Sequence, residues 1–397
     1  MLAAFCALAV LGIAVAWKGG QLPQREPTAA SASAAGELAP DLALYRDVIA
    51  EVRAGGNYYQ VAAQRIPRYG FPTSSPLNWR LPTYAWLLSR LPPALIQPTL
   101  VLLSIIALML AFAARMRTNG IGYAALTIFL LFGVVRWSID GHAYLAQEPW
   151  AATLIIISLS AHALGRREKV GRRGPSPTCA ASGASIADSD QRGHCRPTLG
   201  SASWQLLAIL AGTLALLFRE LALPYCGIAL LLAAFKRRWL EAAGWAAGIA
   251  AFAAFYTWHV TQVHAQLAAL DAASSSSLAQ WLSFGGLDYV LLTTRMNSLF
   301  FQAPGWLLWL YLLAALIGLS RKPSETNQLA CLTAIAYLLA FAILGRPENF
   351  YWGLFPAPFL AWGAAQAPAL VGWALPTTDF ASTPSQLALS REQTCSR

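Results

Sequence analysis

The sequence predicts an all-α protein that crosses a membrane several times. Of its 397 residues, 57% are hydrophobic and 12% are charged, whereas soluble domains carry about 45–50% apolar and about 25% charged residues. Long apolar runs recur along the chain, and short basic stretches separate several of them. We therefore expect about ten transmembrane helices and a long, partly helical first outer loop.

Ten apolar runs approach the roughly 20 residues that a helix needs to cross the hydrocarbon core of a bilayer. They cover residues 1–17, 95–114, 120–137, 150–164, 203–218, 221–235, 239–258, 304–320, 328–345 and 353–374. The first run has neither a basic amino-terminal region nor a small-residue cleavage site. We therefore expect an uncleaved helix there instead of a signal peptide.

Basic connections between the runs predict the orientation of the chain. Four of them follow alternate runs and so share one side, which the positive-inside rule makes cytoplasmic. They contain Arg115 with Arg117, residues 165–173, residues 236–238 and residues 321–322. The segments assigned to the outer side are 18–94, 140–149, 219–220, 259–303 and 346–352. The basic residues that give the chain its net charge of +10 flank the apolar runs. This favours a role in orienting the chain in the membrane over nucleic-acid binding.

The same pattern divides the chain into two transmembrane blocks, residues 1–164 and residues 203–374. Between them, residues 165–202 are rich in Ser, Gly, Pro and Ala, which is typical of a flexible linker. We expect this linker to be cytoplasmic, together with a disordered tail over residues 375–397.

The first outer loop is predicted to be ordered from Asp41 onward. Apolar residues recur at helical spacing over residues 42–52, and Gly55–Gly56 end that helix. A second helix begins near Asn57, and residues 84–91 predict an amphipathic helix at the membrane surface. A loop of this length usually carries a site or a lid.

Three acidic residues of this loop have two interpretations that the sequence leaves open. Asp41 is either a helix-capping residue or a catalytic carboxylate. Asp47 and Glu51 share one face of the predicted helix, and that face is either solvated or part of a site.

Several short motifs resemble those of a known family. Asp41, Tyr45, Gly55–Gly56, Tyr58 and Tyr59 match an Asp-x3-Tyr…Gly-Gly-x-x-Tyr pattern. Together with an amino-terminal span and many later spans, this resembles the GT-C superfamily, in particular its bacterial mannosyltransferase-like members. "SPLNWRLPTYAWL" (75–87) and "HAYLAQEPWAATLI" (142–155) also resemble segments of that family.

The resemblance implies an enzyme of the bacterial inner membrane with its active site on the outer face. Such enzymes transfer a sugar from a polyprenyl-phosphate donor to a glycan, lipid or protein, with inversion at the sugar. The family's essential carboxylate lies in the first outer loop, so Asp41 matches best by position and Asp47 second. No cofactor is predicted, no metal ligands are assigned, and the need for a divalent metal stays open.

The chemistry of sugar transfer suggests further site residues. A cation must stabilise the leaving phosphate, and Arg binds phosphate with a two-pronged geometry. Arg219 and Arg346 each lie where an apolar run ends on the predicted outer side. Other candidates for substrate binding are Glu220, Glu348, Asn349, Tyr351, Trp352, His142 and Glu148.

Purely structural interpretations compete with these roles. Each arginine could instead belong to a salt-bridged helix end. Tyr351 and Trp352 could instead belong to the belt of aromatic residues at the membrane surface. The whole protein is alternatively a transporter or lipid flippase, or a non-catalytic cell-envelope assembly protein. Transport favours charged or broken sites at mid-membrane, whereas the charges here cluster outside the apolar runs, which favours the transferase.

Overall fold

The computed structural model describes residues 38–73, 75–166, 199–269, 284–321 and 324–368. All regular secondary structure in these residues is helical. The predicted span 1–17, the predicted tail and most of the predicted linker lie outside the described residues.

The bundle helices correspond to nine of the predicted apolar spans. They are α5 (Pro93–Asn119), α6 (Ile121–Val135), α7 (Gln147–Gly165), α8 (Leu199–Phe218), α9 (Leu223–Phe235), α10 (Trp239–Ala269), α12 (Gly305–Arg321), α13 (Glu325–Ile343) and α14 (Ala357–Ala364). Among the described residues, four helical stretches are long and apolar enough to cross a membrane, namely α5, Ile121–Ser138, α8 from Gly200 and α13. The all-α membrane class is thus supported, and the number of ten spans stays a prediction.

Two helices differ clearly from the predicted spans. α10 continues to Ala269, so the predicted loop 259–303 begins as a helix. α14 has only 8 residues, whereas about 20 are needed to cross a bilayer. The first part of the predicted span 353–374 belongs instead to the 3-10 helix η7 (Pro347–Leu354), and its last residues lie outside the described part.

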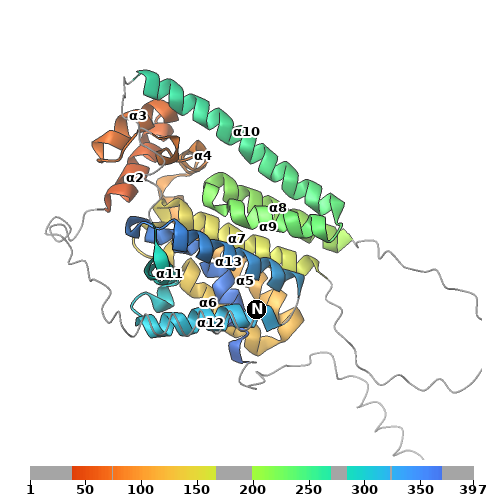
Figure 1. Ribbon diagram of the computed structural model, residues 1–397. Helices are drawn as coiled ribbons and strands as arrows, with labels where there is room; N and C mark the ends of the chain where they lie inside the picture. The colour runs from red at the N-terminus through yellow and green to blue at the C-terminus, as the bar shows by residue number, and fades with distance from the viewer. Residues whose placement is uncertain (1–37, 74, 167–198, 270–283, 322–323, 369–397) are drawn as a thin grey trace, which may run out of the picture.

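The centre of the bundle is α7. Every residue of α7 except Ala163 is buried, and the helix packs against α5, α8 and α13 (Figure 1). A helix that is apolar on all sides is stable only when surrounded by other helices. Its polar Ser158 is satisfied, because the hydroxyl lies 2.5 Å from the Ala208 carbonyl and 2.8 Å from the Tyr225 hydroxyl.

The segment that the sequence predicts to be the first outer loop folds into a helical cap. It contains α2 (Pro40–Arg53), α3 (Tyr58–Arg68), the 3-10 helix η1 (Pro76–Asn78) and α4 (Pro82–Arg90). Figure 1 shows these elements grouped at one end of the bundle, beside the carboxy-terminal end of α10. The hydroxyls of Thr83 and Tyr84 anchor α4 to the bundle by donating to the carbonyls of Leu217 and Leu145.

Local signals explain the ends of these helices. Asn57 caps α3, because its side-chain oxygen accepts hydrogen bonds from the Tyr59 and Gln60 amides at 3.0 and 3.4 Å. Gly55 has φ +96°, which ends α2 as its sequence predicts. The N-cap of α2 is Ala39, which makes no side-chain cap, so Asp41 lies in the first turn of the helix and not at the N-cap itself.

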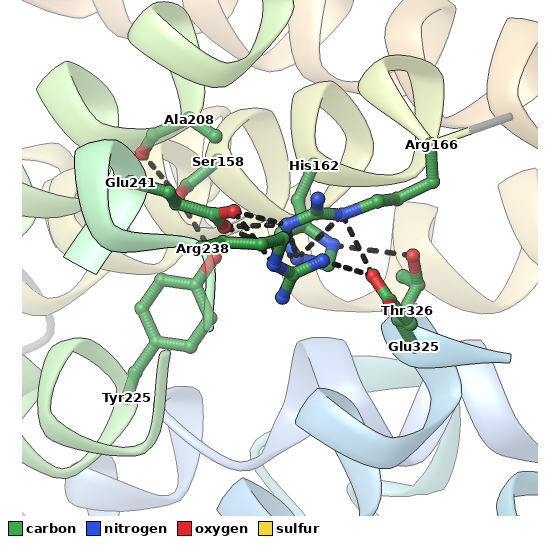
Figure 2. Close-up of polar contacts among 9 residues, drawn as sticks. All are labelled: Ser158, His162, Arg166, Ala208, Tyr225, Arg238, Glu241, Glu325 and Thr326. Atoms are coloured by element: carbon green, nitrogen blue, oxygen red, sulfur yellow. Dashed lines mark hydrogen bonds and ion pairs between the residues drawn. The ribbon is translucent and has the colours of Figure 1, made fainter. Parts of the chain in front are cut away.

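The opposite end of the bundle holds an ionic network, formed by His162, Arg166, Arg238, Glu241 and Glu325. Figure 2 shows both guanidinium groups lying between the two carboxylates. Nη2 of Arg166 lies 2.5 and 2.6 Å from the Glu241 carboxylate oxygens, and Nε of Arg166 lies 3.1 Å from Glu325. Arg238 bridges the same two carboxylates. The network joins α7, the start of α10 and the start of α13.

Polar segments predicted to be cytoplasmic and polar segments predicted to be outside lie at opposite ends of the molecule. Arg166 and Arg238, from connections predicted to be cytoplasmic, meet in the ionic network. The cap, Gln147 and η7, from segments predicted to lie outside, meet at the other end. The alternation of basic connections thus agrees with the packing of the helices.

Replacing Glu241 by Gln is expected to destabilise the fold. Its side chain is 5% exposed and faces two guanidinium groups. The change leaves these two groups with only the partly exposed Glu325 as counter-charge, at a cost of about 3 kcal/mol. Thermal unfolding in detergent measures the loss. Asp140→Asn is the control, because the 3.8 Å Arg136–Asp140 pair is about half exposed and contributes roughly 0–1 kcal/mol. Equal effects of both variants would contradict a structural role for the network.

Candidate functional site

A pocket of about 640 Å³ lies at the cap end of the bundle. α2, α3 and residues 78–85 form one side, and Gln147 with η7 and Arg346 forms the other. The cap contributes mainly apolar walls. The polar lining residues are Asp41, Tyr45, Tyr58, Tyr69, Asn78, Arg80, Gln147, Arg346, Glu348, Asn349 and Tyr351. Apolar walls with a few convergent polar groups are typical of ligand sites of this size.

Asp41 lies in the first turn of α2 and faces this pocket. Its Oδ1 accepts a hydrogen bond from the Leu42 amide at 2.9 Å. Burial raises the pKa of Asp41 above its usual value, the nearby Glu148 carboxylate adds to the rise, and the Leu42 amide and Arg80 oppose it. A carboxylate whose pKa is raised in this way is better suited to accept a proton than a fully solvated one.

Asp47, the second predicted base, is placed differently. It does not line the pocket. The Tyr69 hydroxyl donates to its Oδ2 at 2.5 Å, and Nε of Arg46 lies 3.3 Å from its Oδ1. Glu51, on the same helix face, pairs with Arg65. The geometry therefore favours Asp41 over Asp47 as the carboxylate that meets a ligand.

Arg80 is a pocket residue to which the sequence analysis gives no role. Its Nε donates to the Tyr45 hydroxyl at 3.0 Å, and its Nη2 lies 3.5 Å from the Tyr351 hydroxyl. The Tyr58 hydroxyl donates to the Arg80 carbonyl at 2.5 Å. None of the ion pairs among the described residues involves Arg80. Its hydrogen bonds go to neutral hydroxyls, and the nearest carboxylates act on it only from beyond ion-pair distance, so its guanidinium can still bind an anion.

The predicted cluster "RPENFYW" forms the opposite wall of the pocket. Arg346, Glu348, Asn349 and Tyr351 line it. A kink at Asn349, with φ −96° and ψ 23°, interrupts η7. The Tyr351 hydroxyl donates to Asn349 Oδ1 at 3.1 Å and lies 3.5 Å from Nη2 of Arg80. Tyr351 therefore connects η7 to Arg80 of the cap.

The position of η7 is fixed by close packing against α11 (Gly286–Thr294). A Cβ added to Gly353 would lie 1.9 Å from the Thr293 carbonyl oxygen, so only glycine permits this approach. The Tyr289 hydroxyl also donates to the Asn349 carbonyl at 2.9 Å. Trp352 faces away from the pocket lining, with its ring 6.3 Å from that of Phe341, so it offers no stacking face to a ligand there.

The predicted phosphate residue Arg219 is buried beneath the site. It is 1% exposed, its Nε lies 2.8 Å from Glu148, and its Nη1 lies 2.6 Å from Glu220. None of these three residues lines the pocket. For Arg219 the geometry therefore favours the salt-bridged helix end that the sequence left as the alternative. His142 is exposed and also lies outside the pocket lining.

Gln147 is a second pocket residue without a predicted role. It is 1% exposed, and its Oε1 has no hydrogen-bond partner among the described residues. It immediately precedes Glu148 in the segment "HAYLAQEPW". The signal that points to Arg80 is similar, since it is an arginine inside the proline-flanked "PLNWRLP" of the same loop as Asp41.

Comparison with known proteins identifies the fold. No protein-family model matches the sequence, and no curated protein matches it. A solved structure of ArnT from Cupriavidus metallidurans bound to undecaprenyl phosphate matches 92% of this chain, with 14% sequence identity and a TM-score of 0.50. The fold is ArnT-like. A second structure of that protein, in the apo state, covers 92% of this chain at 15% identity and a TM-score of 0.45.

This likeness supports the all-helical membrane fold that the sequence predicts. The chain spans 59% of the length of the undecaprenyl phosphate-bound ArnT chain. Within the described part of the ArnT-like fold, no three His, Cys, Asp or Glu side chains gather as a metal site requires.

Asp41→Asn is expected to raise stability at neutral pH. Because burial raises the folded-state pKa of Asp41, ionising it costs more in the folded than in the unfolded protein. That cost is absent below the usual pKa of 3.8, grows as the pH rises from there to the raised pKa, and is complete above the raised pKa. The variant should therefore unfold at a higher temperature than wild type at pH 7, and the difference should shrink on acidification. A variant less stable at pH 7 would contradict this assignment.

Proposed function

We propose that the protein is a membrane glycosyltransferase that moves a hexose from a polyprenyl-phosphate donor to a hydroxyl of a glycan, lipid or protein. One observation carries the proposal. Arg80, which forms no ion pair with a carboxylate among the described residues, lines the same pocket as Asp41. The pKa of the Asp41 carboxyl is raised by burial. The ArnT-like fold supports it, because the matching ArnT structure is bound to undecaprenyl phosphate.

In the proposed reaction, Asp41 takes the proton of the acceptor hydroxyl as that oxygen attacks the anomeric carbon. The bond between the anomeric carbon and the phosphate oxygen breaks, and its electron pair leaves with the polyprenyl phosphate. Attack from the face opposite the leaving group inverts the sugar. The pocket supplies orientation, since its two walls hold donor and acceptor at a fixed separation.

Arg80 and Arg346 are the proposed phosphate-binding residues. Both line the pocket, and charge grows on the phosphate oxygens as the bond to the sugar breaks. Arg80 takes the place that the sequence assigned to Arg219, because two carboxylates already neutralise Arg219. The guanidinium of Arg219 is already hydrogen-bonded to two carboxylates, whereas that of Arg80 is hydrogen-bonded to hydroxyls, which a phosphate oxygen can replace or join.

The remaining pocket residues are proposed to bind the sugar. Gln147, Glu348 and Asn349 supply hydrogen-bonding groups, and Tyr351 supplies an aromatic face. Glu148, Arg219 and Glu220 are proposed to support the site from below, because Glu148 faces both Asp41 and Arg219. No contact in the described residues assigns a substrate role to Trp352, His142 or Asp47.

The proposed topology places the pocket on the outer side of the bacterial inner membrane and the ionic network on the cytoplasmic side. The basic residues near the network support this orientation by the positive-inside rule. The proposed division into transmembrane blocks 1–164 and 203–374 follows from the same topology, with residues 165–202 as the connecting cytoplasmic linker. The donor's lipid tail would stay among the membrane lipids.

Transfer in vitro tests the proposed function and its base. Purified wild-type protein is incubated with a membrane extract that contains labelled polyprenyl-phosphate sugars, beside Asp41→Asn and Asp47→Asn. Label should pass to a new product with wild type and Asp47→Asn, and be almost lost with Asp41→Asn. Full activity of Asp41→Asn would refute the assigned base. Absence of transfer in every preparation would favour the transporter or flippase, which vesicle-based lipid-flipping assays would then detect.

Arg80→Gln is expected to lower the rate of transfer by about 10²-fold, comparable to the loss of one donor that stabilises a developing anion. Arg346→Ala should also reduce turnover far more than it reduces the yield of folded protein. Initial rates at several donor concentrations measure both effects. Arg136→Gln is the control, since Arg136 is 46% exposed and does not line the pocket. A rate within twofold of wild type for Arg80→Gln would exclude its phosphate role.

A further inference from the structure

We propose that His259 of α10 is a positioning residue that holds Arg80 in the geometry the pocket needs. The inference rests on the proposed function for its kinetic consequence, because it assigns a purpose to the placement of Arg80. It concerns a residue that the sequence placed in an outer loop and that the proposed reaction does not use.

His259 lies at the contact between α10 and the cap. Its side chain is fully buried, and its Nδ1 lies 3.0 Å from the Tyr59 hydroxyl. The backbone of Trp79 faces the same ring. α10 packs against both α3 and η1, and His259 contacts α3, the helix before the Arg80 segment, through the Tyr59 hydroxyl.

Aromatic packing holds the imidazole in this place. The ring of Trp258 lies 5.7 Å from that of Tyr59 and 6.0 Å from that of Trp86. Phe255 also contacts Trp86, with ring centroids 6.2 Å apart. An edge-to-face aromatic cluster of this kind joins α10 to α3 and α4, so the polar contact of His259 is made within a rigid, largely apolar surrounding.

The contacts of His259 reach Arg80 through Tyr59 and its neighbour Tyr58. Tyr59 adjoins Tyr58, whose hydroxyl holds the Arg80 carbonyl at 2.5 Å. Trp79, on the other side, is 3% exposed and donates from Nε1 to the Thr73 carbonyl at 2.9 Å. The Arg80 carbonyl is thus held by Tyr58 of α3, whose neighbour Tyr59 contacts His259 of α10. The Tyr45 hydroxyl accepts from the Arg80 guanidinium at 3.0 Å.

A polar side chain at this position is not needed for packing alone. Phe or Leu would fill an aromatic cluster without the cost of burying an imidazole. A hydrogen bond, in contrast, fixes direction as well as distance, and a phosphate-binding arginine depends on direction, since a displacement of about 1 Å can cost 10²-fold in rate. His259 therefore fits a role in orientation.

Hydrogen–deuterium exchange tests the positioning without depending on catalysis. Wild type, His259→Leu, His259→Asn and Tyr59→Phe are compared in detergent, with His264→Leu as the control because His264 is exposed on the same helix. The Trp79 amide donates to the Pro76 carbonyl at 3.1 Å, so it should be protected in wild type. Exchange of the peptide containing residues 76–81 should rise about tenfold in His259→Leu and Tyr59→Phe. It should stay unchanged in His264→Leu. Unchanged exchange in His259→Leu would overturn the inference.

Transfer kinetics test the consequence. His259→Leu is expected to lower the transfer rate about tenfold at saturating donor, and His259→Asn should restore most of it, because its side-chain oxygen can accept from Tyr59. In an Arg80→Lys background the same His259→Leu change should have less than a twofold effect, since a residue acting through Arg80 shows non-additivity with it. Fully additive losses would mean that His259 acts on folding and not on Arg80.

The two measurements separate the possible failures. Faster exchange in His259→Leu with no transfer by wild type would refute the proposed function and leave the positioning intact. Transfer by wild type with normal exchange and normal rates in His259→Leu would refute the positioning and leave the proposed function intact.

Discussion

The arrangement of the bundle depends on ion pairs that fix both ends of a buried helix. Every α7 residue except Ala163 is buried, and apolar packing alone would allow the helix to slide along its axis. At one end Glu148 binds Arg219, and near the other end Arg166 binds Glu241. Charges in a low-dielectric interior are costly unless paired. The register of α7 against its neighbours is therefore set at two points.

These pairs also determine which cations face the pocket. Arg219 and Arg80 belong to the same end of the molecule, yet two carboxylates surround the first and tyrosine hydroxyls surround the second. Pairing converts an arginine into a structural element, while neutral partners leave its charge available. The same distinction separates Asp47, held by Tyr69 and Arg46, from the pocket-lining Asp41.

The site joins parts of the chain that are far apart in sequence. The contact between Arg80 and Tyr351 spans 271 positions, and that between Tyr59 and His259 spans 200. η7 meets the cap at the pocket, and Figure 1 shows the long α10 reaching the cap from its flank. A rigid bundle carrying polar groups on short connecting segments is a common way to hold a site in position.

The sequence by itself determined the helical class, the separation of basic and non-basic connections, and the motif that brings Asp41, Tyr45 and Tyr58 together. Each of these features depends on the composition or spacing of residues within a single helix or turn. It also singled out residues 346–352 as a polar outer segment, and four of its residues, Arg346, Glu348, Asn349 and Tyr351, line the pocket. Only the tertiary structure decided that Arg219 is paired and Arg80 is not, that Tyr351 rather than Trp352 faces the pocket, and that α10 extends to the cap. The physical reason is that pairing and burial depend on which helices pack together, and Glu148 reaches Arg219 across 71 positions of the chain.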